Sequence, residues 1–253
     1  MKAIILAAGK GERLKGVIDA VPKPMVRIAG KPILHHNIEW LKKHGVTDIY
    51  VNLHHLPFVV TDYFGEGMRF GVKLSYSYEK ELLGTAGAVR KIADEFLQPW
   101  GDGYFLVVYG DNLMDYDLES IRAFHLAHHA VATIALYRKD EVSQSGIAVL
   151  DCEGRVLRFV EKPKPEERIS NLVNTGIYVL DREALRYMPG GKYLDFGRDV
   201  FPVMARCASA LYGIEVKGRL IAIDTPDLLR AALQTGSDEG RGAERERRVM
   251  SDE

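Results

Sequence analysis

The chain has 253 residues, of which 47% are hydrophobic and 27% are charged, and its formal net charge is −1 at pH 7. This length allows one large α/β domain or two small ones, and the composition is ordinary for a globular protein. Because the charge is balanced, nothing indicates a nucleic-acid partner or an anionic membrane surface, and any anion must bind at a local site.

The N-terminus and the cysteines indicate where the protein resides. The apolar run of residues 3–8 is too short for a signal peptide and leads directly into a glycine-rich loop. No run approaches the ~20 apolar residues that a membrane-spanning helix needs. Cys152 and Cys207 fit no metal-binding spacing or disulfide framework, so we expect two buried thiols in a reducing compartment. The sequence therefore predicts a cytoplasmic protein.

Strands and helices alternate in the first half of the chain. Residues 2–7 form a continuous apolar run, which predicts a strand buried on both faces, and residues 8–31 predict a long loop rich in Gly, Lys, Arg and Pro. The further elements expected here are helices at 32–44, 57–64 and 84–96, and strands at 48–53, 72–78 and 104–108. This alternation predicts βαβ units and an α/β, Rossmann-like fold with a mixed, mainly parallel sheet flanked by helices.

The second half is expected to contain more strands and fewer helices. Strands are predicted at 131–137, 146–150, 156–161, 173–180, 209–216 and 219–223, with a hairpin turn at 151–154 and helices at 181–187, 194–206 and 225–233. We expect residues 1–235 to form a single domain. Residues 236–253 have no apolar face and predict a charged, disordered tail, with a short solvated helix as the alternative.

A glycine-rich loop follows the first predicted strand. Gly9 and Gly11 would let backbone N–H groups approach phosphate oxygens closely. The loop is no P-loop, because Lys10 is followed by glycine instead of Ser or Thr. It also lacks the dinucleotide fingerprint, because Leu14 stands where a third Gly or Ala is needed. By itself the pattern fits a plain glycine-rich turn equally well.

Two cations follow within the same loop. Pro22 and Pro24 stiffen the backbone on either side of Lys23 and fix its direction. Arg13 offers a planar fork and Lys23 a point charge. Together the two side chains suit a polyanion such as a triphosphate.

These segments resemble the opening of the sugar-1-phosphate nucleotidyltransferase family. Its members have Leu-Ala-Gly/Ala-Gly-x-Gly-Thr-Arg-Leu and then Pro-Lys-Pro, and this chain has Leu-Ala-Ala-Gly-Lys-Gly-Glu-Arg-Leu at 6–14 and Pro-Lys-Pro at 22–24. Glu12 replaces the usual Thr, and the usual Pro-Leu after Arg-Leu is absent. The resemblance covers about residues 1–234 and implies the nucleotide-diphospho-sugar transferase fold. It also implies that Arg13 and Lys23 hold the triphosphate of an NTP. The loop residues implied in nucleotide binding are Leu6, Ala7, Ala8, Gly9 and Gly11.

Residues 79–87 resemble the family's nucleobase segment, Glu/Gln-x-x-Pro-x-Gly-Thr-Ala-Gly, with Leu82 in place of Pro. The resemblance implies that Gly84 and Thr85 bind the nucleotide at the start of a helix, where free N–H groups can donate to anionic or carbonyl oxygens. Glu79 corresponds to the residue that reads the base edge. A carboxylate can accept both N1–H and N2–H of guanine, whereas uracil and thymine present one donor. GTP is therefore favoured, and a surface glutamate is the alternative interpretation of Glu79.

The resemblance also implies a Mg²⁺ site. Asp111 follows a buried parallel strand, where ligands bind in α/β sheets, and the family's Gly-Asp there carries the metal ligand. The family's second carboxylate comes from Asp-x-Gly-Thr-Pro, but Ala222 stands at the position of that Asp. Asp224 lies two residues on, so it would point to the same side of an extended strand. Asp224 is equally well interpreted as the N-cap of the helix that follows Thr225-Pro226.

The sugar 1-phosphate site is implied by three further matches. Glu161 and Lys162 lie in Val-Glu-Lys-Pro, where the family binds a sugar hydroxyl and the sugar phosphate respectively. Asn174 begins Asn-x-Gly-Ile-Tyr, and Gly146 matches a glycine that lines the sugar pocket. A charged pair at an exposed strand end is the alternative for residues 161–162.

The function expected from this resemblance is transfer of a nucleotidyl group from an NTP to a sugar 1-phosphate, with release of pyrophosphate. The match favours mannose-1-phosphate guanylyltransferases, with a glucose or heptose 1-phosphate enzyme that uses another NTP as the alternative. Ala222 leaves a third possibility, a catalytically silent subunit that binds nucleotide sugars and regulates an active relative. The chain as given ends without the β-helix domain of longer members, so acyl transfer is not expected, and a homo-oligomer is possible.

Overall fold

The computed structural model describes residues 1–9, 11, 21–96, 103–207, 210–223 and 225–233. Arg13, Asp224 and the expected tail at 236–253 lie outside these residues, as does the end of the expected domain, so the interpretations placed on them stay predictions. In the part that is described, no helix is long and apolar enough to cross a membrane.

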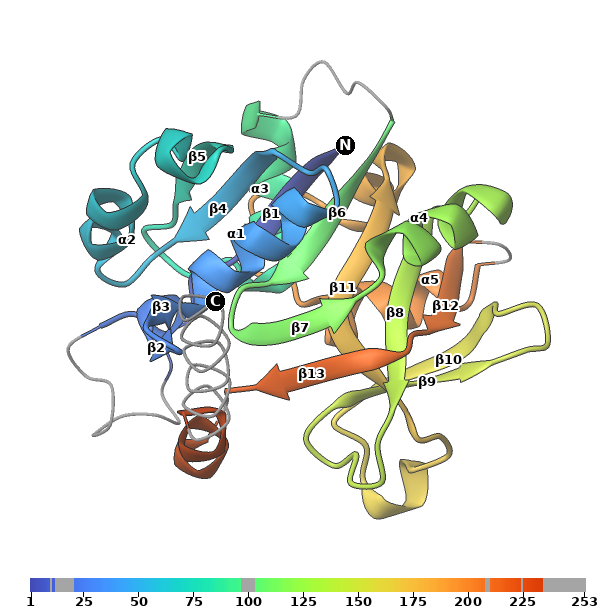
Figure 1. Ribbon diagram of the computed structural model, residues 1–253. Helices are drawn as coiled ribbons and strands as arrows, with labels where there is room; N and C mark the ends of the chain where they lie inside the picture. The colour runs from blue at the N-terminus through green and yellow to red at the C-terminus, as the bar shows by residue number, and fades with distance from the viewer. Residues whose placement is uncertain (10, 12–20, 97–102, 208–209, 224, 234–253) are drawn as a thin grey trace, which may run out of the picture.

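A nine-stranded mixed sheet forms the centre of the molecule (Figure 1). Four parallel neighbours make up one half, in the order β6 (Tyr104–Tyr109), β1 (Lys2–Leu6), β4 (Asp48–Leu53) and β5 (Lys73–Tyr78). The long β11 (Leu172–Asp181) continues the sheet antiparallel to β6. The other half adds β8 (Ala132–Arg138), β9 (Gly146–Leu150), β10 (Val156–Glu161) and β12 (Leu211–Glu215). The predicted mixed, mainly parallel α/β architecture is therefore confirmed.

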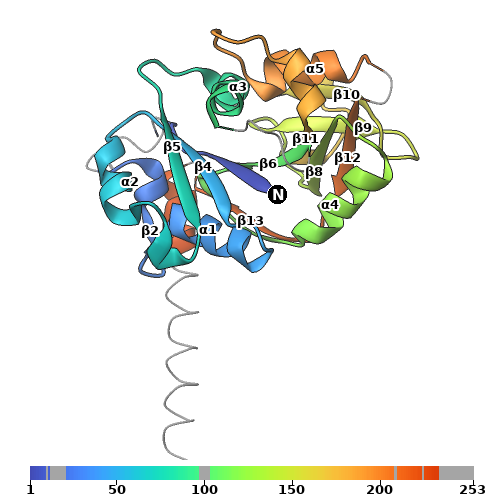
Figure 2. The same ribbon diagram turned by 90° about the horizontal axis from the view of Figure 1, so that it is seen from above.

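Two hydrophobic cores lie on opposite faces of the sheet, because successive side chains of a strand point to opposite sides. In β1, Ala3 and Ile5 belong to one core and Ile4 to the other, and all three are fully buried. The first core packs against α1 (Ile33–Lys43), α2 (Pro57–Phe64) and α4 (Leu118–Ala127). The second packs against α3 (Gly84–Phe96) and α5 (Phe201–Met204), on the other side of the sheet in Figure 2. The buried strand that the apolar run predicted is confirmed.

Two elements after β6 were not predicted. Strand β7 (Asn112–Tyr116) pairs antiparallel with β13 (Gly218–Ala222) in a separate two-stranded sheet. Helix α4 follows directly, and the Asp117 carboxylate caps it by accepting a hydrogen bond from the Glu119 N–H at 3.1 Å. A polar residue before Leu118 was a usable helix-start signal. The partner of β7 lies about a hundred residues later, so no local pattern could indicate that strand.

The remaining predictions hold in outline. The hairpin at 151–154 is confirmed, with Gly154 at φ +83° in a left-handed turn conformation between β9 and β10. The helix predicted at 181–187 is a 3₁₀ helix (Arg182–Tyr187), and a helix occupies residues 226–233. The helix predicted at 194–206 is confirmed over residues 196–204, although its first turn is not α-helical. The chain there forms a single π-helical turn, η6 (Phe196–Val200), followed by the short α5.

Short elements complete the fold. They are the 3₁₀ turns η2 (Lys23–Met25), η3 (Met68–Phe70) and η4 (Pro165–Glu167), and the small hairpin of β2 (Arg27–Ile28) and β3 (Lys31–Pro32). The expectation of buried thiols is wrong, because Cys152 and Cys207 are both exposed. Cys152 lies in the hairpin turn, and Cys207 follows the last turn of α5, and both positions face solvent.

Candidate active site

A cavity of about 250 Å³ opens at the carboxyl ends of β1, β4 and β6. From β1 the chain continues outward to β4 and β5 and then returns to β6 on the other side of β1. Such a switch in strand order is where open α/β sheets bind their ligands. The predicted site residues that line the cavity are Leu6, Ala7, Ala8, Gly9, Lys23, Glu79, Gly84, Thr85 and Asp111.

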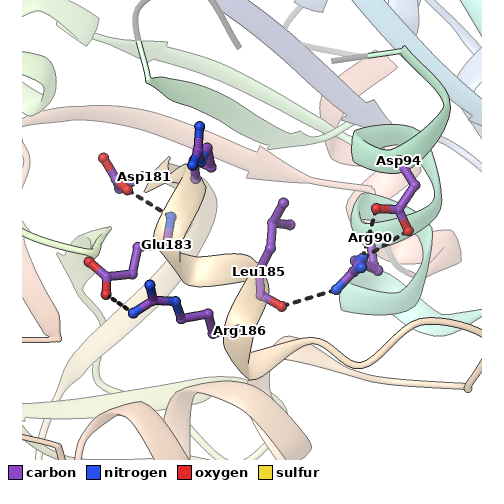
Figure 3. Close-up of a pocket in the computed structure, with 7 residues that line it drawn as sticks. Arg90, Asp94, Asp181, Glu183, Leu185 and Arg186 are labelled. Carbon is purple, nitrogen blue, oxygen red and sulfur yellow. Dashed lines mark hydrogen bonds and ion pairs between the residues drawn. The ribbon is translucent and has the colours of Figure 1, made fainter. Parts of the chain in front are cut away.

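A larger hollow of about 610 Å³ lies between α3 and the 3₁₀ helix after β11, away from these residues (Figure 3). Four of the six charged side chains that line it are paired with one another. Arg90 pairs with Asp94 at 2.8 Å and donates to the Leu185 carbonyl, and Arg186 pairs with Glu183. These contacts fasten α3 to the chain after β11. A paired surface network of this kind explains the hollow without a ligand.

The predicted triphosphate cation and the predicted metal ligand are in direct contact. The Lys23 ammonium donates to Asp111 Oδ2 at 2.6 Å, and the Lys23 side chain is only 7% exposed against 32% for Asp111. Lys23 begins the 3₁₀ turn η2, whose prolines hold it toward the end of β6. A buried ammonium needs an anionic partner. The two side chains therefore form an ion pair in the wall of the cavity. A phosphate that enters the cavity can compete with Asp111 for the Lys23 ammonium.

The residues present fit a Mg²⁺ ion bound together with phosphates. Mg²⁺ usually takes one or two protein carboxylates, with phosphates and waters completing the octahedron. Asp111 supplies one carboxylate at the cavity and is accessible enough to meet a ligand. Within the described ranges, no cluster of three or more His, Cys, Asp or Glu could hold an ion without a substrate. The site thus suits a metal that arrives with the nucleotide.

A buried chain of hydrogen bonds forms the end of the cavity expected to hold the base. Asn52 Oδ1 accepts from the Ala7 N–H at 2.7 Å, and Asn52 Nδ2 donates to Glu79 Oε1 at 2.6 Å. Glu79 Oε2 accepts from the Leu83 N–H at 2.9 Å. Glu79 is 6% exposed, so the alternative of a surface glutamate is wrong. Each oxygen has two lone pairs, and one on each is available to adjacent donors of a base.

The first turn of α3 is packed against residues 192–195. The Leu194 carbonyl accepts from the Ala86 and Gly87 N–H groups at 2.9 and 3.2 Å. A Cβ on Gly84, which has φ +73°, would lie 2.4 Å from the same carbonyl oxygen. The glycine is therefore required by close packing as well as by its backbone conformation. Because Leu194 uses two of the four N–H groups at the helix start, the expected anion site narrows to those of Gly84 and Thr85.

None of the residues implied in sugar binding lines this cavity, but Glu161 lies near Asp195, which does. The Glu161 carboxylate lies between two backbones, since a Cβ on Gly146 or on Gly197 would stand 2.6 or 2.5 Å from its Oε2. Burial raises the pKa of the Glu161 carboxyl, and the nearby Asp195 carboxylate raises it further. Asn174 donates to the Tyr178 hydroxyl at 2.7 Å, deeper in the same region. Gly146 and Glu161 are thus in contact, as expected. Asn174 contacts the Tyr178 hydroxyl.

Lys162 is exposed and has an unusual backbone. Its φ is +51°, a left-handed conformation that costs a residue with a side chain of order 1 kcal/mol, and its N–H donates to the Ser145 carbonyl at 3.1 Å. Strain of this kind gathers at functional sites, because the surroundings must hold it in place. Lys162 therefore lies at an exposed strand end, as the alternative interpretation expects, but its backbone is strained. The strain is the observation that favours the sugar phosphate role over that alternative.

Six residues that line the cavity were not among the predicted site residues, namely Pro24, Asn52, Leu82, Tyr109, Tyr193 and Asp195. Asn52 and Tyr109 carried a usable signal, because both stand at the carboxyl ends of predicted parallel strands. Asp195 caps the turn that follows it and accepts from the Gly197 and Arg198 N–H groups. Its second contact, with Thr85, joins residues 110 positions apart.

The chain is similar in sequence to known proteins. The family described as nucleotidyl transferase matches residues 2–219. A UTP–glucose-1-phosphate uridylyltransferase from Synechocystis is 37% identical over 243 residues, and a mannose-1-phosphate guanyltransferase beta-B from Xenopus laevis is 36% identical over 233. These alignments cover 91% and 89% of this chain but 62% of each relative, so the chain spans about three fifths of their length.

Two solved structures superpose on this chain over nearly their whole length. HddC from Yersinia pseudotuberculosis superposes with a TM-score of 0.77 at 27% identity, covering 92% of this chain and 98% of that one. A putative glucose-1-phosphate thymidylyltransferase from Bacillus anthracis gives 0.80 at 25% identity, covering 94% and 96%. Because the family's model matches residues 2–219 and the fold agrees, the chain belongs to the nucleotidyl transferase family.

Proposed function

We propose that this protein transfers a nucleotidyl group from an NTP to a sugar 1-phosphate. The observation that carries the proposal is the buried Lys23 ammonium paired with Asp111 at the wall of the cavity. A phosphate oxygen of the sugar phosphate attacks the α-phosphorus of the NTP. The bond from that phosphorus to the bridging oxygen breaks, and pyrophosphate leaves with the electron pair. No covalent enzyme intermediate is needed, so catalysis is positioning and charge neutralisation.

Each predicted side chain has a place in this reaction. Lys23, with Arg13, holds the triphosphate of the NTP, and Lys162 orients the phosphate that attacks. Glu161 and Asn174 bind sugar hydroxyls. Mg²⁺ bound through Asp111, with Asp224 as a second candidate ligand, would neutralise phosphate charge and polarise the α-phosphoryl group. The protein's own contribution is a rigid frame that brings the two phosphates into line.

We favour GTP as the nucleotide and mannose 1-phosphate or a related sugar phosphate as its acceptor. Both oxygens of Glu79 are fixed by Asn52 and Leu83, and each retains a lone pair, so the carboxylate suits the paired donors of guanine. A relative named as a guanyltransferase supports this choice. UTP with glucose 1-phosphate is the second candidate, because a relative named as a uridylyltransferase is similar over 91% of this chain.

A substrate panel tests the proposal. GTP, UTP, dTTP, ATP and CTP are combined with mannose, glucose and heptose 1-phosphates, and pyrophosphate release is measured with Mg²⁺ and with EDTA. We expect turnover that EDTA abolishes, fastest with GTP. Faster turnover with UTP and glucose 1-phosphate would select the second candidate. Nucleotide binding without turnover of any pair would refute the proposal and favour the silent regulatory subunit.

A further inference from the structure

The hydroxyl of Thr85 has two hydrogen-bond partners inside the protein. It donates to Asp195 Oδ2 at 3.1 Å and accepts from the Phe196 N–H at 2.9 Å. A hydroxyl has one proton and two lone pairs, so these partners take its proton and one lone pair. The hydroxyl therefore has no proton left to donate to a nucleotide, although Thr85 lies in the segment expected to bind one.

The first of these partners leads toward Glu161. The Asp195 carboxylate bonded to Thr85 also accepts from the Gly197 N–H at 3.0 Å. Gly197 is the residue against which the Glu161 carboxylate rests, with room for no Cβ between them. Three consecutive contacts thus connect the Thr85 hydroxyl to Glu161, and no flexible side chain intervenes except Asp195 itself.

Asn174 is held by separate contacts. It donates to the Tyr178 hydroxyl at 2.7 Å, and the Tyr178 ring packs edge to face on Tyr109 with centroids 5.7 Å apart. The Asn174 carbonyl oxygen in turn accepts from the Gly176 N–H at 2.8 Å, which fixes the side chain. Of the two side chains implied in sugar binding, Glu161 is therefore the one connected to the hydroxyl at the start of α3.

We propose that Thr85 is a positioning residue that holds Glu161 in register with the nucleotide-binding start of α3. Its backbone remains available to the nucleotide, while its hydroxyl sets where Glu161 stands. This inference rests on the proposed function. In-line transfer between two bound phosphates tolerates little misplacement, since a shift of about 1 Å can cost of order 10² in rate.

The test compares Thr85→Val, which keeps the shape and removes the hydroxyl, with Thr85→Ser, which keeps the hydroxyl. We expect Thr85→Val to raise KM for the sugar 1-phosphate by about tenfold and to lower kcat, with KM for the NTP changed less than threefold. Thr85→Ser should stay within threefold of wild type in every constant. Thr61→Val is the matched control, because Thr61 on α2 bonds only the nearby Phe58 carbonyl at an exposed position.

A rise in KM for the NTP alone would overturn the proposal, because it would mean that the hydroxyl binds the nucleotide. Unchanged constants in Thr85→Val would overturn it as well. If Thr85→Val does not accumulate as folded protein, Asp195→Asn takes its place. Asn keeps an oxygen for the Gly197 N–H but replaces the one that Thr85 contacts, and the same rise in KM for the sugar phosphate is expected.

Thermal unfolding separates this proposal from the proposed function. Loss of the buried hydroxyl contacts should lower Tm by about 2–4 °C in Thr85→Val, and Thr85→Ser should restore most of that loss. This measurement needs no turnover. A wild-type protein that turns over no substrate pair would refute the proposed function, whereas a Thr85→Val protein as stable as wild type would refute the linkage through Thr85.

Discussion

Gly197→Ala offers a direct test of Glu161. The new Cβ would stand 2.5 Å from Glu161 Oε2, 3.0 Å from Cδ and 3.2 Å from Cγ. Those atoms are the far end of a flexible side chain, so Glu161 can swing away while the backbone stays in place. The substitution therefore acts on the position of one carboxylate more than on the fold.

The size of the displacement follows from these distances. Ordinary van der Waals contact begins near 3.4 Å, so Glu161 Oε2 must move by about 0.9 Å from its 2.5 Å position. A misplacement of about 1 Å at a substrate contact can cost of order 10² in rate. We expect kcat/KM for the sugar 1-phosphate to fall by about 10- to 100-fold, mostly through KM. Alanine is the better helix former by about 1 kcal/mol, which offsets part of the crowding, so Tm should change little.

Steady-state kinetics with each substrate varied in turn, together with thermal unfolding, measures both effects. Gly190→Ala is the control, because a Cβ there meets nothing closer than Asp94 Oδ2 at 3.9 Å. It should match wild type in every constant. A Gly197→Ala enzyme whose KM for the sugar phosphate stays within twofold of wild type would show that Glu161 does not bind the sugar.

Further substitutions test the other assigned roles. Lys162→Ala should raise KM for the sugar phosphate far more than KM for the NTP, and equal KM values in variant and wild type would leave Lys162 a strand-end charge. Glu79→Gln should reduce the ratio of kcat/KM for GTP to that for UTP, and a wild type that uses UTP or dTTP at least tenfold better than GTP would contradict the role of Glu79. Asp111→Asn should abolish turnover. Asp224→Asn should lower kcat by roughly 10²-fold or more, which corresponds to about 2.7 kcal/mol in the activation barrier. Its Tm should not change, because Asn caps a helix as well as Asp does. Wild-type turnover in Asp224→Asn would leave Asp111 as the only metal carboxylate. Burial lowers the pKa of His125 to about 4, so the unfolded chain binds a proton that the folded one does not. Stability should therefore fall by up to about 3 kcal/mol as pH drops from 6.5 to 4, and urea unfolding of His125→Gln should show a shallower pH dependence over that range.

Local patterns were enough to predict much of the fold. Helices with a clear start and stop, such as α3 from Gly84 to Phe96, were predicted to the residue, because periodicity and flanking residues determine them. The π-helical turn at 196–200 could not be predicted. It exists because Asp195 caps its start and because Phe196 and Val200 are packed in the second core. These are tertiary contacts, and they override a pattern that suits a continuous helix.

The site residues also differ in whether the sequence alone could predict them. Lys23, Glu79 and Asp111 carry motifs that family resemblance makes visible, and all three line the cavity. Asn52 joins the glycine loop to Glu79 through contacts with residues 45 and 27 positions away. Its place at the carboxyl end of a strand was a usable signal for the site, but no local pattern indicates its partners. Only the folded arrangement shows that Asn52 positions the Glu79 carboxylate, which we propose binds the base.

The central place of β1 also affects how the chain can fold during its synthesis. The five residues of β1 pair with residues 48–52 on one side and 105–109 on the other. At 5–20 residues per second, roughly 5–20 s pass before the second partner has been made. During that interval the apolar segment that becomes β1 has at best one neighbour. A nascent chain that ends before residue 104 should therefore depend on chaperone binding at its N-terminus, and it should aggregate when released early.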